Sequence, residues 1–369
     1  MANLLGKITN LDFLKIKKGG SVLGVDIGTS AVKIVQIKKE KGTVVLENYG
    51  ALALGPYAGM EVGQSTNLST KKIVEAIRDL IRESGISTKT AAIAIPLKNT
   101  MISSMEMPDV GEKQLETMVP IEARKHIPVP MSEVALNFWT IPKPEPKTIS
   151  APVKNNKKNT IEVLIAAIHN DSINKYQEIE KGAELEPELF EIEIFSTIRS
   201  LIGSDTDPIM VIDIGAGVTK LATVEYGVLR GSHIINKGSQ DISRALAASL
   251  GIDIAKAEEI KRDPSVLDEE SRKQFVEVVS FPLGRIFSEA NSVLLDYQKK
   301  HNKTVSKVIF SGGGVLVPGL FDLAKETFKI DIVMGDPFAR LESPVFLDKT
   351  LKTIGPEFSV AIGLALEAI

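Results

Sequence analysis

Two short segments of the chain place an aspartate, a glycine and small residues in an order that suits phosphate and metal binding. The first is Asp26-Ile27-Gly28-Thr29-Ser30, which lies between two apolar, strand-like stretches. A glycine turn lets the backbone approach an anion closely, and successive N–H groups in such a turn form a concave anion nest. An aspartate beside the nest can hold a divalent cation through water, because magnesium keeps much of its hydration shell. Taken alone, this one segment is better explained as an ordinary hairpin turn.

The second segment, Asp213-Ile214-Gly215-Ala216-Gly217, repeats the first at a constant offset. The aligned pairs are Asp26 with Asp213, Gly28 with Gly215, and Lys33 with Lys220. A repeat this far apart in the chain is not the period of a solenoid, so it indicates two related domains that each carry one strand–turn–strand unit. We predict that the two turns face each other and hold a nucleotide triphosphate and its metal ion between them.

Two further glycine segments lie in the second half of the chain. Ser311-Gly312-Gly313-Gly314 follows the apolar residues VIF, so a flat group could press against bare backbone there. The segment matches neither the GxGxxG pattern of dinucleotide folds nor the lysine-containing P-loop. The polar loop 236–241 contains Gly238 and leads into a helix. The N-terminus of that helix either donates N–H groups to phosphate or is simply capped by Ser239 or Asp241.

The composition excludes several classes of protein. The 369-residue chain has a net charge of −3, which gives no support to nucleic-acid binding. It has no cysteine, which excludes disulfides and thiolate metal sites and fits a reducing compartment. Its four histidines form no HxH or HxxxH pair, so we expect no zinc site. No apolar run reaches the length of about 18 residues that a transmembrane segment needs, and the start of the chain lacks the features of a signal peptide.

Hydrophobic periodicity indicates an α/β protein with two main domains and an insert. The expected domains are a first one at 21–90, 184–204 and 355–369, an inserted α+β subdomain at 91–183, and a second domain at 205–354. Helices are expected at 191–202 and 281–300, where apolar residues recur at helical spacing. Residues 1–19 fit either a basic tail or a short amphipathic helix, and the proline- and lysine-rich stretch 142–159 is expected to be a solvated loop.

The motifs DIGTSAVK, DIGAGVTKL and SGGGVLVPGL, in this order and spacing, resemble those of the actin-like ATPase superfamily. Its members place two phosphate loops and a glycine-rich adenosine loop around a cleft between two domains. Within it the chain is most similar to the PilM family of type IV pilus assembly, a relative of FtsA, through MISSMEMPDV, IEARKHIPVPMSEVALNFW, AEEIKR and GDPF. The resemblance runs from about Ser21 to the C-terminus. It implies the actin-like ATPase fold, with two related domains around a nucleotide cleft and an α+β subdomain inserted in the first.

The resemblance also implies roles for individual residues. Those expected at the phosphates are Gly28, Thr29, Ser30, Gly215, Ala216, Gly217 and Gly238. Those expected at the adenosine are Gly312, Gly313 and Gly314, with Glu258 and Lys261 near the ribose or base. Asp26 and Asp213 are expected beside the magnesium ion. Lys33 and Lys220 either point toward the phosphates or face solvent as strand residues.

The function implied by the resemblance is that of an ATP-binding scaffold under the inner membrane. Proteins of this family are cytoplasmic, lie peripheral to that membrane, and bind the cytoplasmic N-terminal peptide of the inner-membrane protein PilN. Residues around Met101–Met107 and Ile121–Met131 are the candidates for contacting such a peptide. Contacts with other pilus assembly proteins and self-association are further expectations. Slow or absent ATP hydrolysis is expected, because Asp213 is the only group we can name that could position a water for attack on the γ-phosphate.

Two alternatives remain open at this point. One is an FtsA-like filament-forming protein, which would carry an amphipathic membrane helix after the apolar segment SVAIGLALEAI; no such tail follows it here. The other is a small-molecule kinase of the same superfamily, which would need an aspartate base in the cleft of the first domain. We find no clear motif for that base, so the scaffold is the favoured interpretation.

Overall fold

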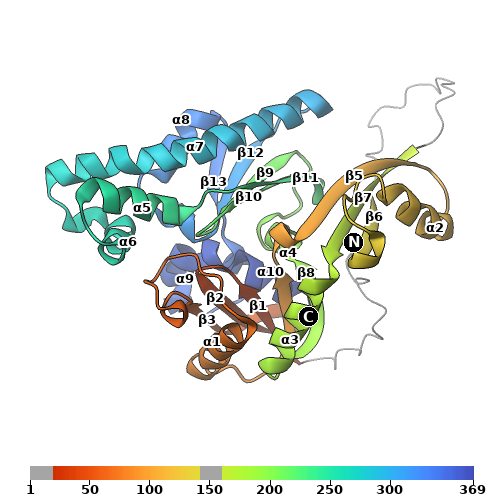
Figure 1. Ribbon diagram of the computed structural model, residues 1–369, viewed down its shortest axis with the longest axis horizontal. Coiled ribbons are helices and arrows are strands. Elements are labelled where there is room, and N and C mark those ends of the chain that lie inside the picture. Colours follow the sequence, from red (N-terminus) through yellow and green to blue (C-terminus); the bar gives the residue numbers. More distant parts are fainter. Residues whose placement is uncertain (1–19, 142–159) are drawn as a thin grey trace. The chain divides into compact units, whose positions relative to one another are not determined.

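The computed structural model describes residues 20–141 and 160–369, which form two compact units (Figure 1). The smaller unit contains residues 98–174, and the larger contains the described residues before and after it. The tail or amphipathic helix expected at 1–19 and the loop expected at 142–159 lie outside the described residues. Within the described ranges, no helix combines the length and the apolar character that crossing a membrane requires.

The larger unit contains two five-stranded sheets with the same strand order, β3-β2-β1-β4-β8 and β11-β10-β9-β12-β13. The first sheet consists of β1 (Ser21–Ile27), β2 (Ala31–Glu40), β3 (Thr43–Ala53), β4 (Thr90–Ile95) and β8 (Glu186–Ile192). The second consists of β9 (Ile209–Ile214), β10 (Thr219–Glu225), β11 (Val228–Ile235), β12 (Lys307–Ser311) and β13 (Asp331–Met334). In both, three antiparallel strands are followed by two parallel ones. The duplication seen in two turns therefore extends to whole sheets.

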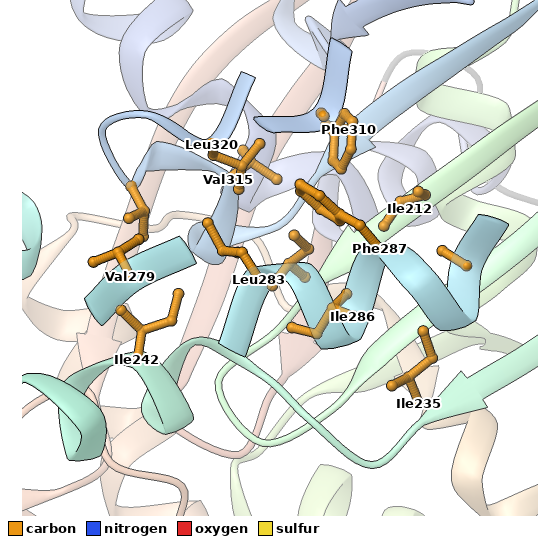
Figure 2. Packing of buried hydrophobic residues seen from close by; sticks show 14 of the residues in the cluster. Ile212, Ile235, Ile242, Val279, Leu283, Ile286, Phe287, Phe310, Val315 and Leu320 are labelled. Atoms are coloured by element: carbon orange, nitrogen blue, oxygen red, sulfur yellow. The ribbon is translucent and has the colours of Figure 1, made fainter. Parts of the chain in front are cut away.

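Helices accompany each sheet, and we call each sheet with its helices a lobe. Lobe 1 carries α1 (Thr70–Glu83), α3 (Asn170–Gly182), α4 (Glu193–Leu201), α9 (Asp348–Ile354) and α10 (Ser359–Glu367). Lobe 2 carries α5 (Ser239–Leu250), α6 (Ile254–Arg262), α7 (Glu269–His301) and α8 (Leu320–Phe328). The core of lobe 2 forms where α7 crosses its sheet: Phe287 packs beside Ile212 and Phe310, with the two phenyl centroids 5.5 Å apart (Figure 2). Burial of these large side chains holds the strand ends of lobe 2 in place.

Two elements differ from the sequence-based expectation. Helix α7 begins at Glu269, well before the expected position 281, because the Asp268 carboxylate caps it by accepting the Ser271 N–H at 2.8 Å. Pro282 lies buried inside the helix. The helix expected from residue 191 begins at Glu193, since the residues before it form the unforeseen strand β8. This strand pairs in parallel with β4.

The smaller unit is a three-stranded antiparallel sheet with one packed helix. Its strands, in the order β5-β7-β6, are β5 (Thr100–Pro108), β7 (Thr160–His169) and β6 (Val134–Ile141), and its helix is α2 (Glu112–Ala123). Leu115 and Val119 of α2 are buried in the core that this helix shares with the sheet. The two outer strands, β5 and β6, are edges of this sheet, and an edge strand can accept an extended peptide.

The observed division at residues 98 and 174 is narrower than the insert expected at 91–183. Strand β4 belongs to the larger unit, because it pairs in parallel with β1 and β8. The end of α3 belongs there too, since Tyr176 and Ile179 are buried in the core of lobe 1. Sequence patterns alone did not show which neighbours these residues would find.

Lobe 1 depends on backbone approaching backbone at two glycines. An added Cβ on Gly24 of β1 would lie 1.9 Å from the Ala361 carbonyl oxygen. An added Cβ on Gly363 of α10 would lie 1.9 Å from the Ser196 carbonyl oxygen of α4. A glycine inside a helix suggests close packing, and Gly363 is packed in this way. This packing explains why a helix interior contains a residue that usually weakens it.

We expect Gly363→Ala to lower the free energy of unfolding by about 2 kcal/mol, because the methyl group would push α10 away from α4. Helix propensity alone predicts the opposite sign, a gain of about 1 kcal/mol. Gly284 of α7 is the matched control, since an added Cβ there meets no atom within 4 Å. Gly284→Ala should stabilise the protein in the same urea titration. A stabilised Gly363→Ala variant would show that the close approach is not real.

Candidate nucleotide site

The two aspartate–glycine turns have the same local structure. The Gly28 N–H donates to the Ala31 carbonyl at 3.0 Å, and the Gly215 N–H donates to the Val218 carbonyl at 3.0 Å. Within residues 20–141 and 160–369, four amides at the tips of the turns have no hydrogen-bond acceptor. They are the amides of Thr29, Ser30, Ala216 and Gly217. Each turn therefore presents two N–H groups that an anion could accept.

The two turns are connected to each other by the loop between β3 and α1. Thr66 donates from its backbone N–H (2.9 Å) and its hydroxyl (2.8 Å) to the Thr29 carbonyl. Its neighbour Ser65 donates its N–H to the Gln240 side chain of α5 at 3.2 Å. An added Cβ on Gly217 would lie 2.9 Å from the Ser65 hydroxyl oxygen. The tips of both turns thus border the same loop, although they come from different lobes.

Gly238 lies beside the second turn, but its amide is already engaged. It donates to the Asp241 carboxylate at 2.9 Å. The next two amides, of Ser239 and Gln240, donate to the carbonyls of Gly215 and Ala216. Of the two sequence interpretations, capping by Asp241 describes this helix start, and its amides are not aimed at a ligand. An added Cβ on Gly238 would lie 2.4 Å from the Ala216 carbonyl, so close packing explains this glycine.

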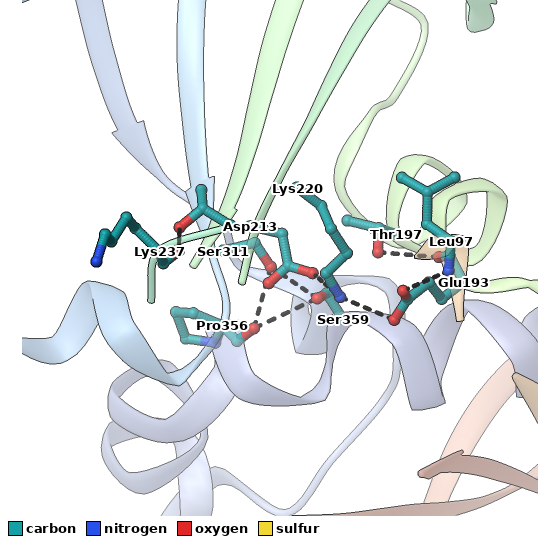
Figure 3. A network of polar contacts seen from close by, with 10 residues as sticks. Leu97, Glu193, Thr197, Asp213, Lys220, Lys237, Ser311, Pro356 and Ser359 are labelled. Carbon is teal, nitrogen blue, oxygen red and sulfur yellow. Dashed lines mark hydrogen bonds and ion pairs between the residues drawn. The ribbon is translucent and has the colours of Figure 1, made fainter. Parts of the chain in front are cut away.

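A buried polar network joins the lobes next to the turns (Figure 3). The Lys220 ammonium lies 2.8 Å from an Asp213 carboxylate oxygen in lobe 2 and 2.8 Å from a Glu193 carboxylate oxygen in lobe 1. The other Glu193 oxygen accepts the Leu97 N–H at 2.7 Å. Lys220 therefore does not face solvent, which was one of the two expectations for it. Lys33 lies opposite Asp26 in the β1–β2 register and is half-buried.

Electrostatics in this network favour a charged lysine and disfavour a charged Asp26. Burial would lower the pKa of Lys220, but the carboxylates of Asp213, Glu193 and Asp26 raise it above its ordinary value. Burial raises the pKa of Asp26 to about 6, against the opposing effect of Lys33 and Lys220. Because Lys220, Glu193 and Asp213 all act on the pKa of Asp26, the aspartates of the two turns belong to a single charged cluster.

The glycine-rich segment after β12 packs against both lobes. Gly312 has a φ of +86°, and an added Cβ would lie 2.3 Å from an Asp213 carboxylate oxygen, so only glycine fits. Its N–H donates to the Pro356 carbonyl at 2.8 Å, and Ser311 lies 2.7 Å from the Ser359 hydroxyl. Gly314 is pressed against Ile214. Gly313 is the open member of the three: its added Cβ would only reach the Glu357 side chain at 3.4 Å.

The expected adenosine-binding residues of α6 form a buried group near that segment. The Lys261 ammonium lies 2.6 Å from the Glu258 carboxylate, which also accepts the Ser243 hydroxyl at 2.6 Å. Burial alone would raise the pKa of Glu258, but these two donors hold it below its ordinary value. The side chain of Glu357 lies next to Gly313, and its carboxylate acts electrostatically on Lys261. An added Cβ on Gly63, in the loop that connects the turns, would lie 2.3 Å from the Glu258 carboxyl carbon.

The residues do not form an evident metal cage. No group of three or more histidine or acidic side chains in the described residues has the arrangement that holds a metal ion. Asp213 is engaged by Lys220, and the cavity lined by Asp213, Lys220 and Glu193 has a volume of only about 10 Å³. Such a space holds at most one water, whereas magnesium keeps several. In the part of the chain that the structure describes, Asp26 forms no ion pair, so of the two aspartates it is the one that fits the water shell of an ion carried by phosphate.

Sequence reasoning missed Glu193, Ser243, Gly63 and Glu357. Glu193 was read as one of several acidic residues in a helix, because strand β8 was not recognised. Glu193 lies at the junction of a buried strand and a helix. A carboxylate buried there needs a partner, so this position could have indicated a polar network. The other three gave no signal in the sequence, because their partners lie far along the chain.

The solved structures that resemble this chain share its architecture. The "PilM-PilN type IV pilus biogenesis complex" superposes with a TM-score of 0.77 at 23% identity, over 94% of this chain and 98% of that one. The ethanolamine utilization protein EutJ from Carboxydothermus hydrogenoformans gives 0.55 at 17% identity, over 98% and 95%. Two duplicated sheets with paired phosphate-type turns define a protein of the actin-like ATPase fold. Residues 24–369 match the family model described as "Type IV pilus assembly protein PilM". The chain belongs to that family.

Sequence similarity also connects the chain to cell-division proteins. FtsA of Neisseria meningitidis serogroup B is 24% identical over 379 residues, covering 92% of this chain and 88% of its own. FtsA of Pseudomonas aeruginosa is 23% identical over 368 residues, covering 88% and 85%. The similarity spans both lobes and the smaller unit, which agrees with the relationship expected from the sequence.

The raised pKa of Asp26 predicts how stability depends on pH. The folded state holds a proton on Asp26 up to about pH 6, whereas the unfolded chain releases it near the ordinary aspartate pKa of 3.8. Between these values the folded state binds more protons, so stability falls as pH rises. Relative to Asp26→Asn, the wild type should lose up to about 3 kcal/mol between pH 4 and 6 and no more above that.

Unfolding titrations of both proteins across this pH range measure the difference. Asp268→Asn is the control. The Ser271 N–H lowers the pKa of Asp268, so the contribution of Asp268 to stability is lost as pH falls, and the pH dependence of stability has the opposite sign. Equal slopes for the wild type and Asp26→Asn would show that Asp26 is ionised throughout.

Proposed function

We propose that the chain is an ATP-binding scaffold of type IV pilus assembly, in which ATP sits between the two lobes of the larger unit. The observation that carries this proposal is the pair of turns with unpaired amides. Thr29 and Ser30 from lobe 1, and Ala216 and Gly217 from lobe 2, offer N–H groups beside one connecting loop. Backbone amides at two converging turns suit a chain of phosphates better than a single anion.

The remaining predicted residues fit the other parts of the nucleotide. Gly313 leaves open space for a flat base or sugar, and the neighbouring Glu258 and Lys261 can accept from and donate to a ribose or base. Lys33 and Lys220 supply positive charge at the phosphate end. Magnesium would arrive on the triphosphate, where it neutralises phosphate charge, with Asp26 facing its water shell. Gly238 and Gly312 then serve the site by allowing its backbone segments to pack closely.

Slow or absent hydrolysis follows from how the carboxylates are engaged. In-line attack on a γ-phosphate needs a group that positions water. Asp213 is bound to Lys220, and Glu193 is bound to Lys220 and the Leu97 N–H. With these oxygens occupied, ATP acts as a structural ligand that stabilises the closed lobes by mass action. This distinguishes the scaffold from a kinase, for which a sugar or other acceptor would stimulate turnover.

The partner we propose is the cytoplasmic N-terminal peptide of a PilN-like inner-membrane protein. The similar solved structure is of a complex that contains PilN. In this chain, the smaller unit offers an edge strand, β5, and the exposed Ile121 on α2, and both lie in the segments expected to contact a peptide. Such docking would hold the protein in the cytoplasm against the inner membrane. Other pilus assembly proteins and further copies of the chain are additional proposed partners.

Gly313→Val should reduce ATP affinity by at least about a hundredfold, because its branched side chain would fill the space proposed for the adenosine. The nearest atoms to the added Cβ belong to a flexible glutamate at 3.4 Å, so the fold should tolerate the change. Gly231→Val on β11 is the control, as an added Cβ there meets nothing within 4 Å. Calorimetric titration with ATP measures both. Undiminished affinity in Gly313→Val would remove the adenosine assignment.

Ile121→Asp should weaken retention of the membrane partner by about tenfold, since a charge would replace an exposed apolar contact on α2. The measurement is a pulldown from solubilised membranes, followed by titration with the cytosolic peptide of whichever bitopic protein is retained. Val276→Asp on α7 is the control, because that valine is also exposed but lies in lobe 2. Equal retention by both variants would place the peptide elsewhere.

A further inference from the structure

The cluster at the junction of the lobes contains a lysine whose ion pairs with carboxylates of both lobes go beyond the charge it supplies at the proposed phosphate site. Lys220 of β10 reaches Asp213 on the neighbouring strand and Glu193 at the start of α4, both at 2.8 Å. The three side chains are only 14%, 10% and 12% exposed. A lysine this deeply paired has lost its hydration and is held by the two carboxylates.

The duplicated turn shows that this arrangement is specific to one half of the chain. Asp26 faces Lys33 in the β1–β2 register, and Asp213 faces Lys220 in the β9–β10 register. The same cross-strand pair of residue types therefore occurs in both lobes. Only Lys220 bridges to a carboxylate of the other lobe, because α4 begins next to it with Glu193.

The charged side chains at the junction of the lobes have a small net negative charge. Three carboxylates, of Asp26, Glu193 and Asp213, act on one another here, together with the ammonium groups of Lys33 and Lys220. The cavity lined by Lys220 and its two partners, about 10 Å³, has room for one water at most. A hydrated divalent ion could approach these partners only by displacing the ammonium, since like charges repel strongly where water is excluded.

We propose that the Lys220 ammonium is a built-in cation that bridges the carboxylates of the two lobes and takes the place of a protein-held metal ion there. The part of this inference that concerns nucleotide rests on the proposed function. If ATP binds between the lobes, its affinity depends little on magnesium, because the positive charge at this position belongs to the protein. Lys220 is a positioning residue in this account: it sets the charge and spacing of Asp213 and Glu193.

The first test uses manganese alone, as a paramagnetic substitute for magnesium, on the nucleotide-free protein. By electron paramagnetic resonance, the wild type should show no site at this junction. Lys220→Met should gain one at least about tenfold tighter than any wild-type binding, because two buried carboxylates are then left without a cation. Adding Asp213→Asn should abolish the gained site. Equal manganese binding by wild type and Lys220→Met would overturn the proposal.

The second test compares nucleotide affinity in magnesium and in EDTA, using a fluorescent ATP analogue. For the wild type the ratio should stay within about threefold, and for Lys220→Met it should exceed about tenfold, which corresponds to about 1.4 kcal/mol. Lys220→Arg keeps the charge and should behave like the wild type. Lys307→Met is the matched control, since Lys307 also pairs with a carboxylate, that of Asp205, but outside the cluster. A strong magnesium dependence in the wild type would overturn the inference.

The two tests distinguish a variant that fails to fold from a failure of the proposed function. If Lys220→Met does not fold, Lys220→Gln, which removes the charge but keeps a hydrogen-bond donor between the two carboxylates, is used in both tests with the same expectations. If no protein binds nucleotide in either buffer, the proposed function fails. The manganese experiment then still decides whether Lys220 occupies a cation position.

Discussion

One lysine ammonium joins buried carboxylates that come from the two halves of the larger unit. Asp213 and Glu193 have little access to water, a buried carboxylate without a cationic partner is costly, and Lys220 is the partner of both. The neighbouring features depend on this junction. The second turn is continuous with Asp213, and the glycine segment after β12 packs against the Asp213 carboxylate. Moving Lys220 would disturb a charged network and the backbone segments around it together.

Glycines have two separate uses in this structure. Some leave amides or space open, as Gly217 and Gly313 do, and these suit a ligand. Others permit backbone segments to touch, as at Gly24 and Gly363 in lobe 1 and at Gly238 beside the second turn. The sequence shows both kinds as the same letter. Only the tertiary structure shows which glycine leaves an amide or space open and which one packs closely against other atoms.

The duplication explains why the two lobes share one architecture. The differences between the lobes explain why we propose that the protein retains its nucleotide. Both lobes keep the same strand order and the same glycine turn, so within the described residues both have turn amides without a hydrogen-bond acceptor. The cross-strand lysines have different surroundings, since Lys220 is buried against Glu193 while Lys33 is only half-buried. A site that keeps its anion-binding backbone but ties up its carboxylates is better suited to retaining a nucleotide than to hydrolysing it. That agrees with a scaffold role in a family of pilus assembly proteins.

The sequence alone determined the repeat and the α/β class, because these depend on local patterns: alternating strands, glycine turns and their spacing. The actin-like fold and the family came from the resemblance of its motifs to those of a known superfamily. The sequence also located most of the candidate site, since strand ends with the same motif lie at the same edge of related sheets. It did not determine strand β8, the start of α7 or the limits of the smaller unit. Each of these was decided by a partner elsewhere, as β8 was by β4.

Only the tertiary structure decided which polar groups are already engaged. The Gly238 amide donates to Asp241, Lys220 is held by two carboxylates, and Glu193 lies at the centre of the junction. These facts depend on side chains from segments separated by many residues, brought together by packing of the two lobes. No spacing in the sequence encodes them, because hydrogen bonds and ion pairs form between whichever groups the completed fold places within reach.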